Sequence, residues 1–398
     1  MSASKFEVIA AGHLCLDIIP GFPGAGLGLA DLLVPGKLVD ISDAVLSTGG
    51  ASSNVGLALH RMGFDAGIVG KVGDDIFGDA VVKLLRTNGE RLVRDMIVSK
   101  GEGTSYSIVI NPPGVDRMIL HSPGTNDTFG EAEISDSILS SVRLLHFGYP
   151  PLMRRFHINR GDEIKKLFGR ARRLGVTTSL DMARPDPDGL SGKIDWAELL
   201  ANVLPEVDVF VPSVDETIFM LDPALFNTLL EKAGDANPAA VMDIETISET
   251  ADRLLAMGAA VIGLKLGDQG FYLKTTPNPD RLAAMGRAAP ADIDAWTGRE
   301  LLAPCRRVKV AGTLGAGDCT IGGFLGALLR GLPPDAAAAM AVAAGGASVE
   351  VRDANTGVPS WDVLESRLTA GWAEAPCAVA PDAWRRTPAG NRCRSDYA

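Results

Sequence analysis

The chain has 398 residues, of which 46% are apolar and 22% are charged, and its formal net charge is −11. This composition is typical of a soluble globular protein with one large domain or two ordinary ones. The acidic balance argues against a protein that wraps nucleic acid or lies on an anionic membrane surface. Because the sequence has neither a signal-peptide pattern nor an apolar run near the roughly 20 residues of a membrane span, we expect a cytoplasmic protein.

Buried strand-like runs alternate with helical patterns along most of the chain. Strands are predicted at 6–12, 66–73, 142–148, 176–182, 207–213, 260–267 and 306–312. Helices are predicted at 52–63, 76–89, 160–175, 247–258 and 320–331. The strands are continuously apolar rather than alternating, which indicates an α/β fold with a parallel sheet covered on both faces. Such sheets usually bind ligands where the carboxyl ends of their strands meet.

Four segments depart from this pattern. Residues 20–47 are rich in Gly and Pro and end in a strand-like run, and 103–121 read as two strands around an Asn-Pro-Pro-Gly turn. Together they predict a small sheet that projects as a lid, although a surface hairpin without function fits the pattern equally well. An irregular insertion is expected at 275–304, and a disordered or loosely draped tail at 373–398.

Cysteine and histidine are scattered along the chain. The five cysteines show no spacing typical of a zinc site, so we expect buried or free thiols in a reducing compartment. The histidines are interpreted as structural or surface residues, with His13 the one that lies near the predicted site. The cysteines are Cys15, Cys305, Cys319, Cys377 and Cys393.

A Gly-Ala-Gly-Asp corner, from Gly315 to Asp318, lies between a predicted strand and a predicted helix. Amides at a helix N-terminus have no partner within the helix and carry the positive end of its dipole, so they suit an anion. Asp318 is interpreted as a base that takes a proton from an attacking hydroxyl while the amides hold a phosphoryl group. The alternative is an ordinary helix-starting Asp after a Gly-rich turn.

A second constellation lies near the N-terminus. Gly49 and Gly50 precede a helix whose first turn carries Asn54, and Asp17 follows the first strand. A Gly-Gly turn allows a small polyol to approach the backbone, and carboxylate and amide groups bind hydroxyls. A solvated Asp at a strand end is the alternative for Asp17.

Taken together, these residues resemble the PfkB, or ribokinase-like, family of carbohydrate kinases. The resemblance covers roughly 6–368. Its motifs are Gly-Gly-Ala-x-x-Asn at 49–54 with Gly-x-x-Gly-Asp-Asp at 70–75, and Gly-Ala-Gly-Asp at 315–318. It implies a three-layer αβα sandwich with a mainly parallel central sheet. The kinase domain would span 1–372, with a projecting β-lid from about 18–48 and 103–126.

The resemblance implies transfer of a phosphoryl group from ATP, with Mg²⁺, to a hydroxyl of a sugar or sugar-like acceptor, and a homodimer formed through the lid. No nucleic acid or membrane partner is expected. The family's site positions fall on the following residues: Asp318 as general base, Gly315, Ala316 and Gly317 as anion hole, Asp17, Gly49, Gly50 and Asn54 around the acceptor, Ser213, Gly267, Gly270 and Thr313 at the nucleotide, and Glu216 organising magnesium through water.

Three departures from the family pattern stand out. Residues 312–314 are Gly-Thr-Leu where the family often has Asp-Thr-Thr, which leaves activation by a monovalent cation open. Ser213 replaces the usual Asn of Asn-x-x-Glu. Because 179–187 lacks the usual Asp-x-Asn-x-Arg, no role is assigned to Asp181 or Arg184.

Two alternative functions remain at this point, a nucleoside kinase of the same family and a catalytically idle sensor of a sugar or nucleotide. The expected lid offers Tyr106 and a few aliphatic residues for stacking on a base, which favours sugars. The intact corner with Asp318 favours an enzyme.

Overall fold

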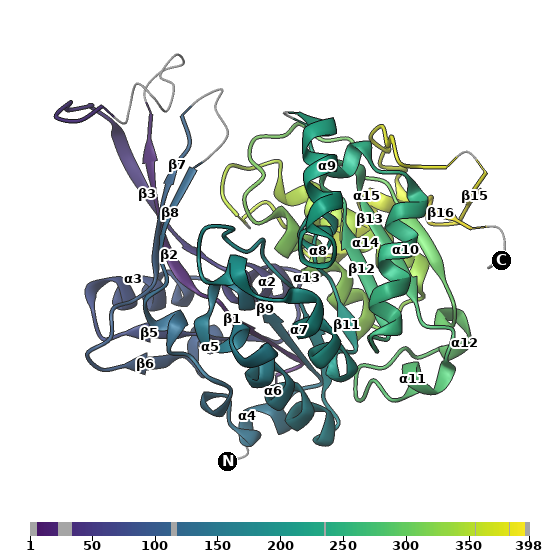
Figure 1. The fold of residues 1–398 in the computed structure, drawn as a ribbon, viewed down its shortest axis with the longest axis horizontal. Helices are drawn as coiled ribbons and strands as arrows, with labels where there is room; N and C mark the ends of the chain where they lie inside the picture. Colours follow the sequence, from purple (N-terminus) through teal and green to yellow (C-terminus); the bar gives the residue numbers. More distant parts are fainter. Residues whose placement is uncertain are drawn as a thin grey trace.

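The computed structural model describes residues 6–22, 34–112, 118–234, 236–354, 356–381 and 383–394. A ten-stranded sheet forms the centre of the protein (Figure 1). The six strands from β4 to β12 in its spatial order are parallel, and the other four are antiparallel. In spatial order the strands are β15 (Arg385–Arg386), β16 (Arg392–Cys393), β14 (Glu300–Ala303), β13 (Phe271–Thr275), β12 (Val261–Lys265), β11 (Val209–Phe210), β10 (Thr177–Leu180), β9 (Leu144–Gly148), β1 (Val8–Gly12) and β4 (Ala66–Val69).

Helices cover both faces of this sheet, and each face has its own apolar core. The first layer contains α4 (Asp136–Ser140), α5 (Arg154–His157), α6 (Asp162–Arg173), α7 (Trp196–Val203), α8 (Val214–Leu221), α9 (Pro223–Ala233) and α10 (Ile244–Ala256). The second contains α2 (Ala51–Arg61), α13 (Ala316–Leu329), α14 (Pro334–Ser348) and α15 (Trp361–Thr369). None of the helices in the described ranges combines the length and apolarity that crossing a bilayer requires.

The first strand shows why its sequence is continuously apolar. Ile9 and Ala11 pack into the core on one face of the sheet, whereas Val8 and Ala10 pack into the core on the other. Successive side chains of a strand point to opposite faces, so a strand covered on both sides needs apolar residues at every position. The predicted three-layer α/β sandwich is confirmed.

A second sheet projects from the main body and forms the lid (Figure 1). Strand β2 pairs with β3 on one side and with β7 on the other, and Asp17 lies opposite Ser107 in this register. Residues 23–33 and 113–117, which belong to the expected lid segments, lie outside the described residues. The expected homodimer through the lid stays a prediction. The lid strands are β2 (Cys15–Gly21), β3 (Ser42–Gly49), β7 (Tyr106–Ile110) and β8 (Met118–Ser122).

Smaller elements support the base of the lid. Helix α3 (Ile76–Arg86) packs on an apolar cluster that includes Leu14 and Leu16 at the start of the lid. The short strands β5 (Lys71–Gly73) and β6 (Ile97–Ser99) pair beside it. The lid is therefore attached to the main body through this packed base, next to the ends of β1 and β4.

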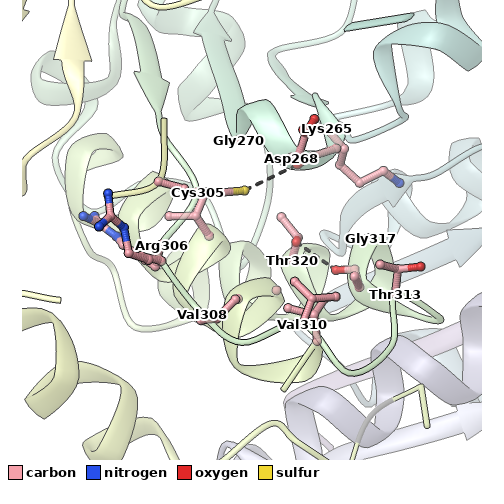
Figure 2. Close-up of a pocket in the computed structure, with 18 of the residues that line it drawn as sticks. Lys265, Asp268, Gly270, Cys305, Arg306, Val308, Val310, Thr313, Gly317 and Thr320 are labelled. Carbon is pink, nitrogen blue, oxygen red and sulfur yellow. Dashed lines mark hydrogen bonds between the residues drawn. The ribbon is translucent and has the colours of Figure 1, made fainter. Parts of the chain in front are cut away.

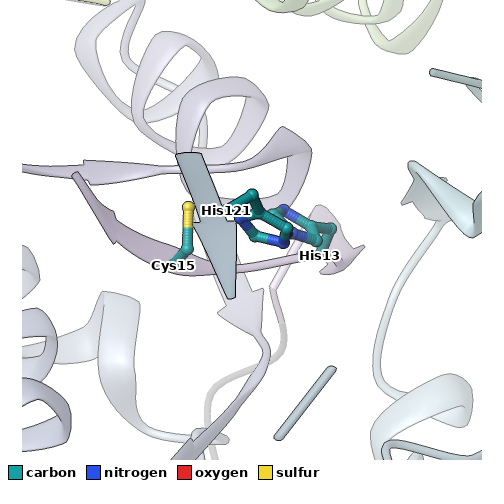
Figure 3. A group of neighbouring side chains, drawn as sticks. All are labelled: His13, Cys15 and His121. Carbon is teal, nitrogen blue, oxygen red and sulfur yellow. Dashed lines mark hydrogen bonds between the residues drawn. The ribbon is translucent and has the colours of Figure 1, made fainter. Parts of the chain in front are cut away.

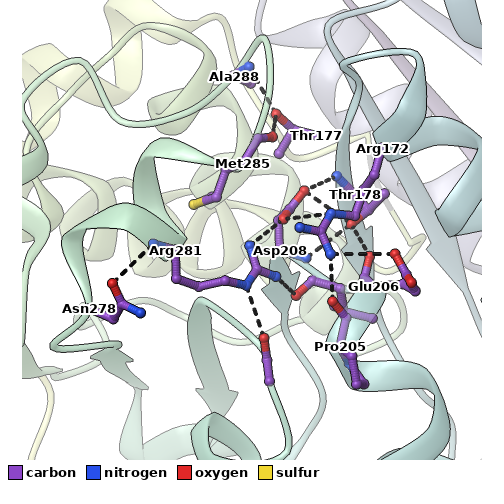
Figure 4. Close-up of polar contacts among 12 residues, drawn as sticks. Arg172, Thr177, Thr178, Pro205, Glu206, Asp208, Asn278, Arg281, Met285 and Ala288 are labelled. Carbon is purple, nitrogen blue, oxygen red and sulfur yellow. Dashed lines mark hydrogen bonds and ion pairs between the residues drawn. The ribbon is translucent and has the colours of Figure 1, made fainter.

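The segment 275–304, predicted as an irregular insertion, contains regular structure. It includes α11 (Pro279–Ala283), α12 (Ile293–Trp296) and the buried strand β14. Figure 4 shows how α11 is attached: the Arg281 guanidinium donates to the buried Asp208 carboxylate at 2.7 Å and to the Val207 carbonyl at 2.7 Å. The short strand in this segment was missed because four residues give little pattern, and its pairing with β13 decides its structure.

The tail also differs from its prediction as a disordered or loosely draped segment. Its described residues add β16 and β15 to the open edge of β14. Asn391 is fully buried, and its Nδ2 donates to the Asp335 carbonyl at 2.8 Å. An open sheet edge presents unpaired backbone groups, so even a short polar strand gains hydrogen bonds by covering it.

The residues before the glycine corner differ from prediction as well. Residues 306–312 form no strand, apart from an isolated bridge between Arg306 and Glu374. Several of these residues line a cavity instead. The apolar pattern here reflects a cavity wall rather than a place in the sheet.

Candidate functional site

Five polar residues lie at or just after the carboxyl ends of five neighbouring parallel strands. They are His13 after β1, Tyr149 after β9, Asp181 after β10, Ser213 after β11 and Lys265 at the end of β12. Because the strands are parallel and adjacent, their carboxyl ends meet at one edge of the sheet. The fold therefore gathers on one edge groups that the chain spreads over about 250 residues.

The glycine corner faces this edge. Gly315 precedes α13 with a φ of 70°, and a Cβ there would lie 2.4 Å from the Ala354 carbonyl oxygen, so this position requires glycine. Asp318 lies in the first turn of α13 and is 1% exposed. The Ala316 amide makes a long contact of 3.4 Å to the Thr313 carbonyl. The early amides of a helix have no acceptor within the helix, so the corner retains donors for an anion.

The Asp318 carboxylate is held on both oxygens. Asn54 Nδ2 donates to its Oδ2 at 2.9 Å, and the Tyr149 hydroxyl donates to its Oδ1 at 2.9 Å. Burial raises the pKa of Asp318, while the Lys265 charge and the two hydrogen bonds oppose this rise. A carboxylate with a raised pKa accepts a proton more readily, which suits a general base.

Asp17 lies close to the glycine pair that precedes α2. A Cβ at Gly49 would lie 2.2 Å from Asp17 Oδ2, so only glycine leaves room for this carboxyl group. Asp17 is 6% exposed, and the Cys15 thiol donates to its Oδ1 at 3.3 Å. Gly50, at a φ of 93°, precedes the helix that carries Asn54 to Asp318. The predicted acceptor residues therefore lie around the start of α2, and Asn54 joins them to Asp318.

A cavity of about 630 Å³ borders the glycine corner (Figure 2). Lys265, at the end of β12, and Gly317, in the first turn of α13, border it at one side, and Arg306 and Val308 border it at the far side. Six residues of the predicted phosphate and nucleotide site line this cavity, namely Ser213, Gly267, Gly270, Thr313, Ala316 and Gly317.

Lys265 is the cation of the cavity wall that lies next to the glycine corner. Its Nζ lies 2.6 Å from Asp181 Oδ1, and a Cβ at Gly317 would lie 3.8 Å from the same Nζ. Burial alone would lower the pKa of Lys265, but the Asp181 and Glu216 carboxylates raise it overall. Lys265 therefore keeps a positive charge beside the glycine corner.

Two carboxyl groups, those of Asp181 and Glu216, interact with the positive charge of Lys265. Burial raises the pKa of Asp181 to about 6 and the pKa of Glu216 to about 8, although Lys265 acts in the opposite direction. Glu216 Oε2 accepts from the Ser213 amide at 2.9 Å, which closes a capping box at the start of α8. Among the described residues, Asp181 Oδ2 is buried without a hydrogen-bond partner.

The raised pKa of Glu216 predicts a measurable pH dependence. Between its ordinary value of 4.5 and about 8, the folded state binds a proton that the unfolded state has lost. The free energy of unfolding should therefore fall as pH rises through this window. In Glu216→Gln, the free energy of unfolding, measured by urea denaturation of the metal-free protein, should fall less steeply with pH. Glu365 is exposed, so Glu365→Gln should not change this pH dependence. If this free energy depended on pH equally in the wild type and in Glu216→Gln, the raised pKa of Glu216 would be contradicted.

Sequence reasoning missed Tyr149 and Lys265 and gave no role to Asp181. Each follows or ends a buried strand, and a polar residue at that position is the signal that was available. The scattered histidines and cysteines of the sequence also predict no cluster. The structure instead brings together His13, Cys15 and His121, although 108 residues separate the two histidines.

The sequence is similar to those of known proteins over most of its length. Residues 27–361 match the family described as pfkB family carbohydrate kinase. The chain is 26% identical over 342 residues to 2-dehydro-3-deoxygluconokinase of Thermoproteus tenax, a match that covers 85% of this chain and 90% of the relative.

Solved structures resemble the fold over most of its length. The fructokinase with bound ATP from Xylella fastidiosa superposes with a TM-score of 0.67 at 17% identity, covering 92% of this chain and 99% of that one. The Arabidopsis thaliana ribokinase complexed with ribose and ATP superposes with a TM-score of 0.65 at 16% identity, covering 91% and 98%.

Proposed function

The chain belongs to the pfkB family of carbohydrate kinases, phosphotransferases with an alcohol acceptor, and from this premise we propose that it transfers the γ-phosphoryl group of ATP to a hydroxyl of a sugar or sugar-like acceptor. The observation that carries the proposal is the position of Asp318. This buried carboxylate lies between the group that contains Asn54 and the cavity that contains Lys265.

The cavity beside the corner is the proposed ATP site. Its glycines, Gly267 and Gly270, allow the backbone to approach a nucleotide, and Thr313 and Ser213 add polar groups. At about 630 Å³ its volume lies within the usual range for small-molecule sites. The amides of Gly315, Ala316 and Gly317 would hold the transferred phosphoryl group, and Lys265 would add positive charge.

The carboxyl groups next to Lys265 fit a magnesium ion. Mg²⁺ prefers oxygen ligands, and the buried Asp181 Oδ2 is an oxygen without a hydrogen-bond partner in the described part of the chain. Asp181 and Glu216, the latter through water, are the residues that would hold the ion. When bound, Mg²⁺ neutralises charge on the phosphate oxygens.

Asp318 is the proposed general base. One of its carboxylate oxygens takes the proton of the acceptor hydroxyl, whose oxygen then forms a bond to the γ-phosphorus as the bond to the ADP oxygen breaks. The Tyr149 and Asn54 contacts hold the carboxylate in one orientation before the reaction. Phosphoryl transfer depends mainly on positioning and charge stabilisation, which these fixed contacts provide.

Asp17, Gly49, Gly50 and Asn54 form the proposed acceptor site. The lid strand β2 carries Asp17, so the same sheet that covers the acceptor also supplies a carboxylate for its hydroxyls. Excluding water from the site matters because water would otherwise compete as the nucleophile.

A coupled assay of ADP release tests the proposal. Neutral sugars, sugar acids and nucleosides are each supplied with Mg²⁺ and ATP, and the same protein without acceptor gives the background. We expect ADP release that depends on a sugar or sugar acid. Turnover with a nucleoside alone would assign a nucleoside kinase, and nucleotide binding without ADP release in any mixture would favour the idle sensor.

A further inference from the structure

Three metal-ligating side chains meet where the lid joins the body. We propose that His13, Cys15 and His121 form a binding site for a transition-metal cation of the Zn²⁺ class (Figure 3). His13 follows the core strand β1, Cys15 begins β2, and His121 lies on the lid strand β8. No part of the proposed phosphoryl transfer uses this cluster.

The two histidine nitrogens are spaced as they would be on one shared ion. His13 Nε2 and His121 Nε2 lie 3.2 Å apart. Two nitrogens bound to one tetrahedral Zn²⁺ at about 2.0–2.1 Å would lie about 3.3–3.4 Å apart. The ligand atoms of all three residues lie within 4.8 Å of one another. A bound thiolate would lie about 3.6 Å from each nitrogen, so Cys15 Sγ needs to move by at most about 1 Å.

The surroundings orient the ligands. His121 Nδ1 lies 3.1 Å from the Ser107 hydroxyl, a hydrogen bond that leaves Nε2 directed at His13. Histidines that ligate metals usually hold their other ring nitrogen through such a contact. His13 is 3% exposed, and among the described residues its Nδ1 is buried without a hydrogen-bond partner. The His13 carbonyl accepts from the Ser52 hydroxyl at 2.8 Å, which fixes the backbone that carries the ring.

The ligand set selects the metal. Two imidazoles and a thiol suit Zn²⁺ and related borderline cations, whereas Mg²⁺ prefers oxygen and is expected at the separate carboxyl pair. Binding replaces the thiol proton, which the Cys15 Sγ now directs to Asp17, and this proton leaves to solvent as the sulfur–metal bond forms. Three protein ligands leave a fourth position open to water.

Such an ion would have two effects. It would tie the lid strand β8 to the end of β1, because His121 and His13 would share it. It would also lie beside Asp17, so it should compete with the acceptor and not with ATP. This second effect rests on the proposed function, whereas the binding itself does not.

Calorimetric titration of the metal-free protein with ZnCl₂, in the presence of excess Mg²⁺, measures the site directly. We expect one tightly bound Zn²⁺ per chain. Titration with CoCl₂ should give a thiolate-to-cobalt absorption that reports the Cys15 ligand. Both readouts are independent of kinase activity, so a failed activity assay would not affect them.

Variants assign the ligands. His121→Ala and Cys15→Ser should each weaken Zn²⁺ binding by more than the roughly 10- to 100-fold loss that follows removal of an outer-shell partner. Cys15→Ser should also abolish the cobalt absorption. The matched controls are His60→Ala and Cys393→Ser, which lie outside the cluster and should bind as wild type does. Thermal melting checks that each variant is folded.

Two outcomes would overturn the proposal. One is the absence of stoichiometric Zn²⁺ binding to the wild-type protein. The other is unchanged binding in folded His121→Ala protein, which would place the metal elsewhere. If Cys15→Ser fails to fold, the His121→Ala result still decides, because His121 lies on a lid strand at the edge of its sheet.

Discussion

Asp318→Asn is expected to lower kcat by about 10²- to 10⁴-fold, the usual effect of removing a general base, while ATP still binds. Asparagine has nearly the shape of aspartate but cannot accept the hydroxyl proton. The measurement is steady-state turnover with the best acceptor, together with calorimetric binding of ATP. The raised pKa and the two 2.9 Å contacts of Asp318 are the basis for the assignment.

A matched control separates this role from the general effect of a charge at a helix start. Asp362 lies in the first turn of α15 as Asp318 does in α13, but it is exposed. Asp362→Asn should leave turnover unchanged. A folded Asp318→Asn protein that retains wild-type kcat would show that another group takes the proton.

Lys265→Met should destabilise the protein and weaken ATP binding together. Removing one partner of a buried ion pair typically costs about 3–5 kcal/mol, because the remaining charge loses its compensation. Asp181, at 2.6 Å from Lys265 Nζ, is left without it, and Glu216 also loses its nearby cation. Urea denaturation measures the stability change, and calorimetry measures the affinity for ATP.

The loss of stability in Lys265→Met should depend on pH. The positive charge of Lys265 lowers the pKa of both Asp181 and Glu216, so both should take up protons more readily in the variant. Protonation removes the uncompensated charge, so the loss of stability should be smallest in acid. It should grow as pH rises above about 6 to 8, the pKa values of Asp181 and Glu216 in the wild type. A deficit that shrinks with rising pH would contradict this account.

Lys274 offers the matched control for Lys265. It is also a buried lysine of the same sheet, and it pairs with Asp252 at 2.7 Å and with Glu300 at 3.7 Å. Lys274→Met should lower stability as well but leave ATP affinity unchanged, because Lys274 does not line the cavity. Equal loss of ATP affinity in both variants would show that Lys265 stabilises the fold without a specific role in ATP binding.

The layers of the fold and the glycine corner could be predicted because their signals are local. A run such as Val8 to Ala11 is apolar at every position, which indicates a strand covered on both faces. Gly315 and Asp318 stand three residues apart at the start of one helix, so their proximity follows from helix geometry alone.

The short strands of the tail and of the 275–304 segment could not be predicted in the same way. Strand β16 contains Arg392 and Cys393 and has no apolar period of its own. It forms because the edge of β14 offers backbone hydrogen bonds, and this edge exists only once the sheet is assembled. The pattern of 306–312 predicted a strand, but several of these residues line a cavity, whose wall also needs apolar side chains.

The sequence by itself determined the alternation of strands and helices and the conformation of the glycine turns, because each depends on neighbours within a few residues. The tertiary structure alone decided that Tyr149 contacts Asp318, that Lys265 lies beside Asp181, and that two histidines 108 residues apart face each other. Strand order brings these groups together, and strand order follows from how the whole sheet packs rather than from any local pattern.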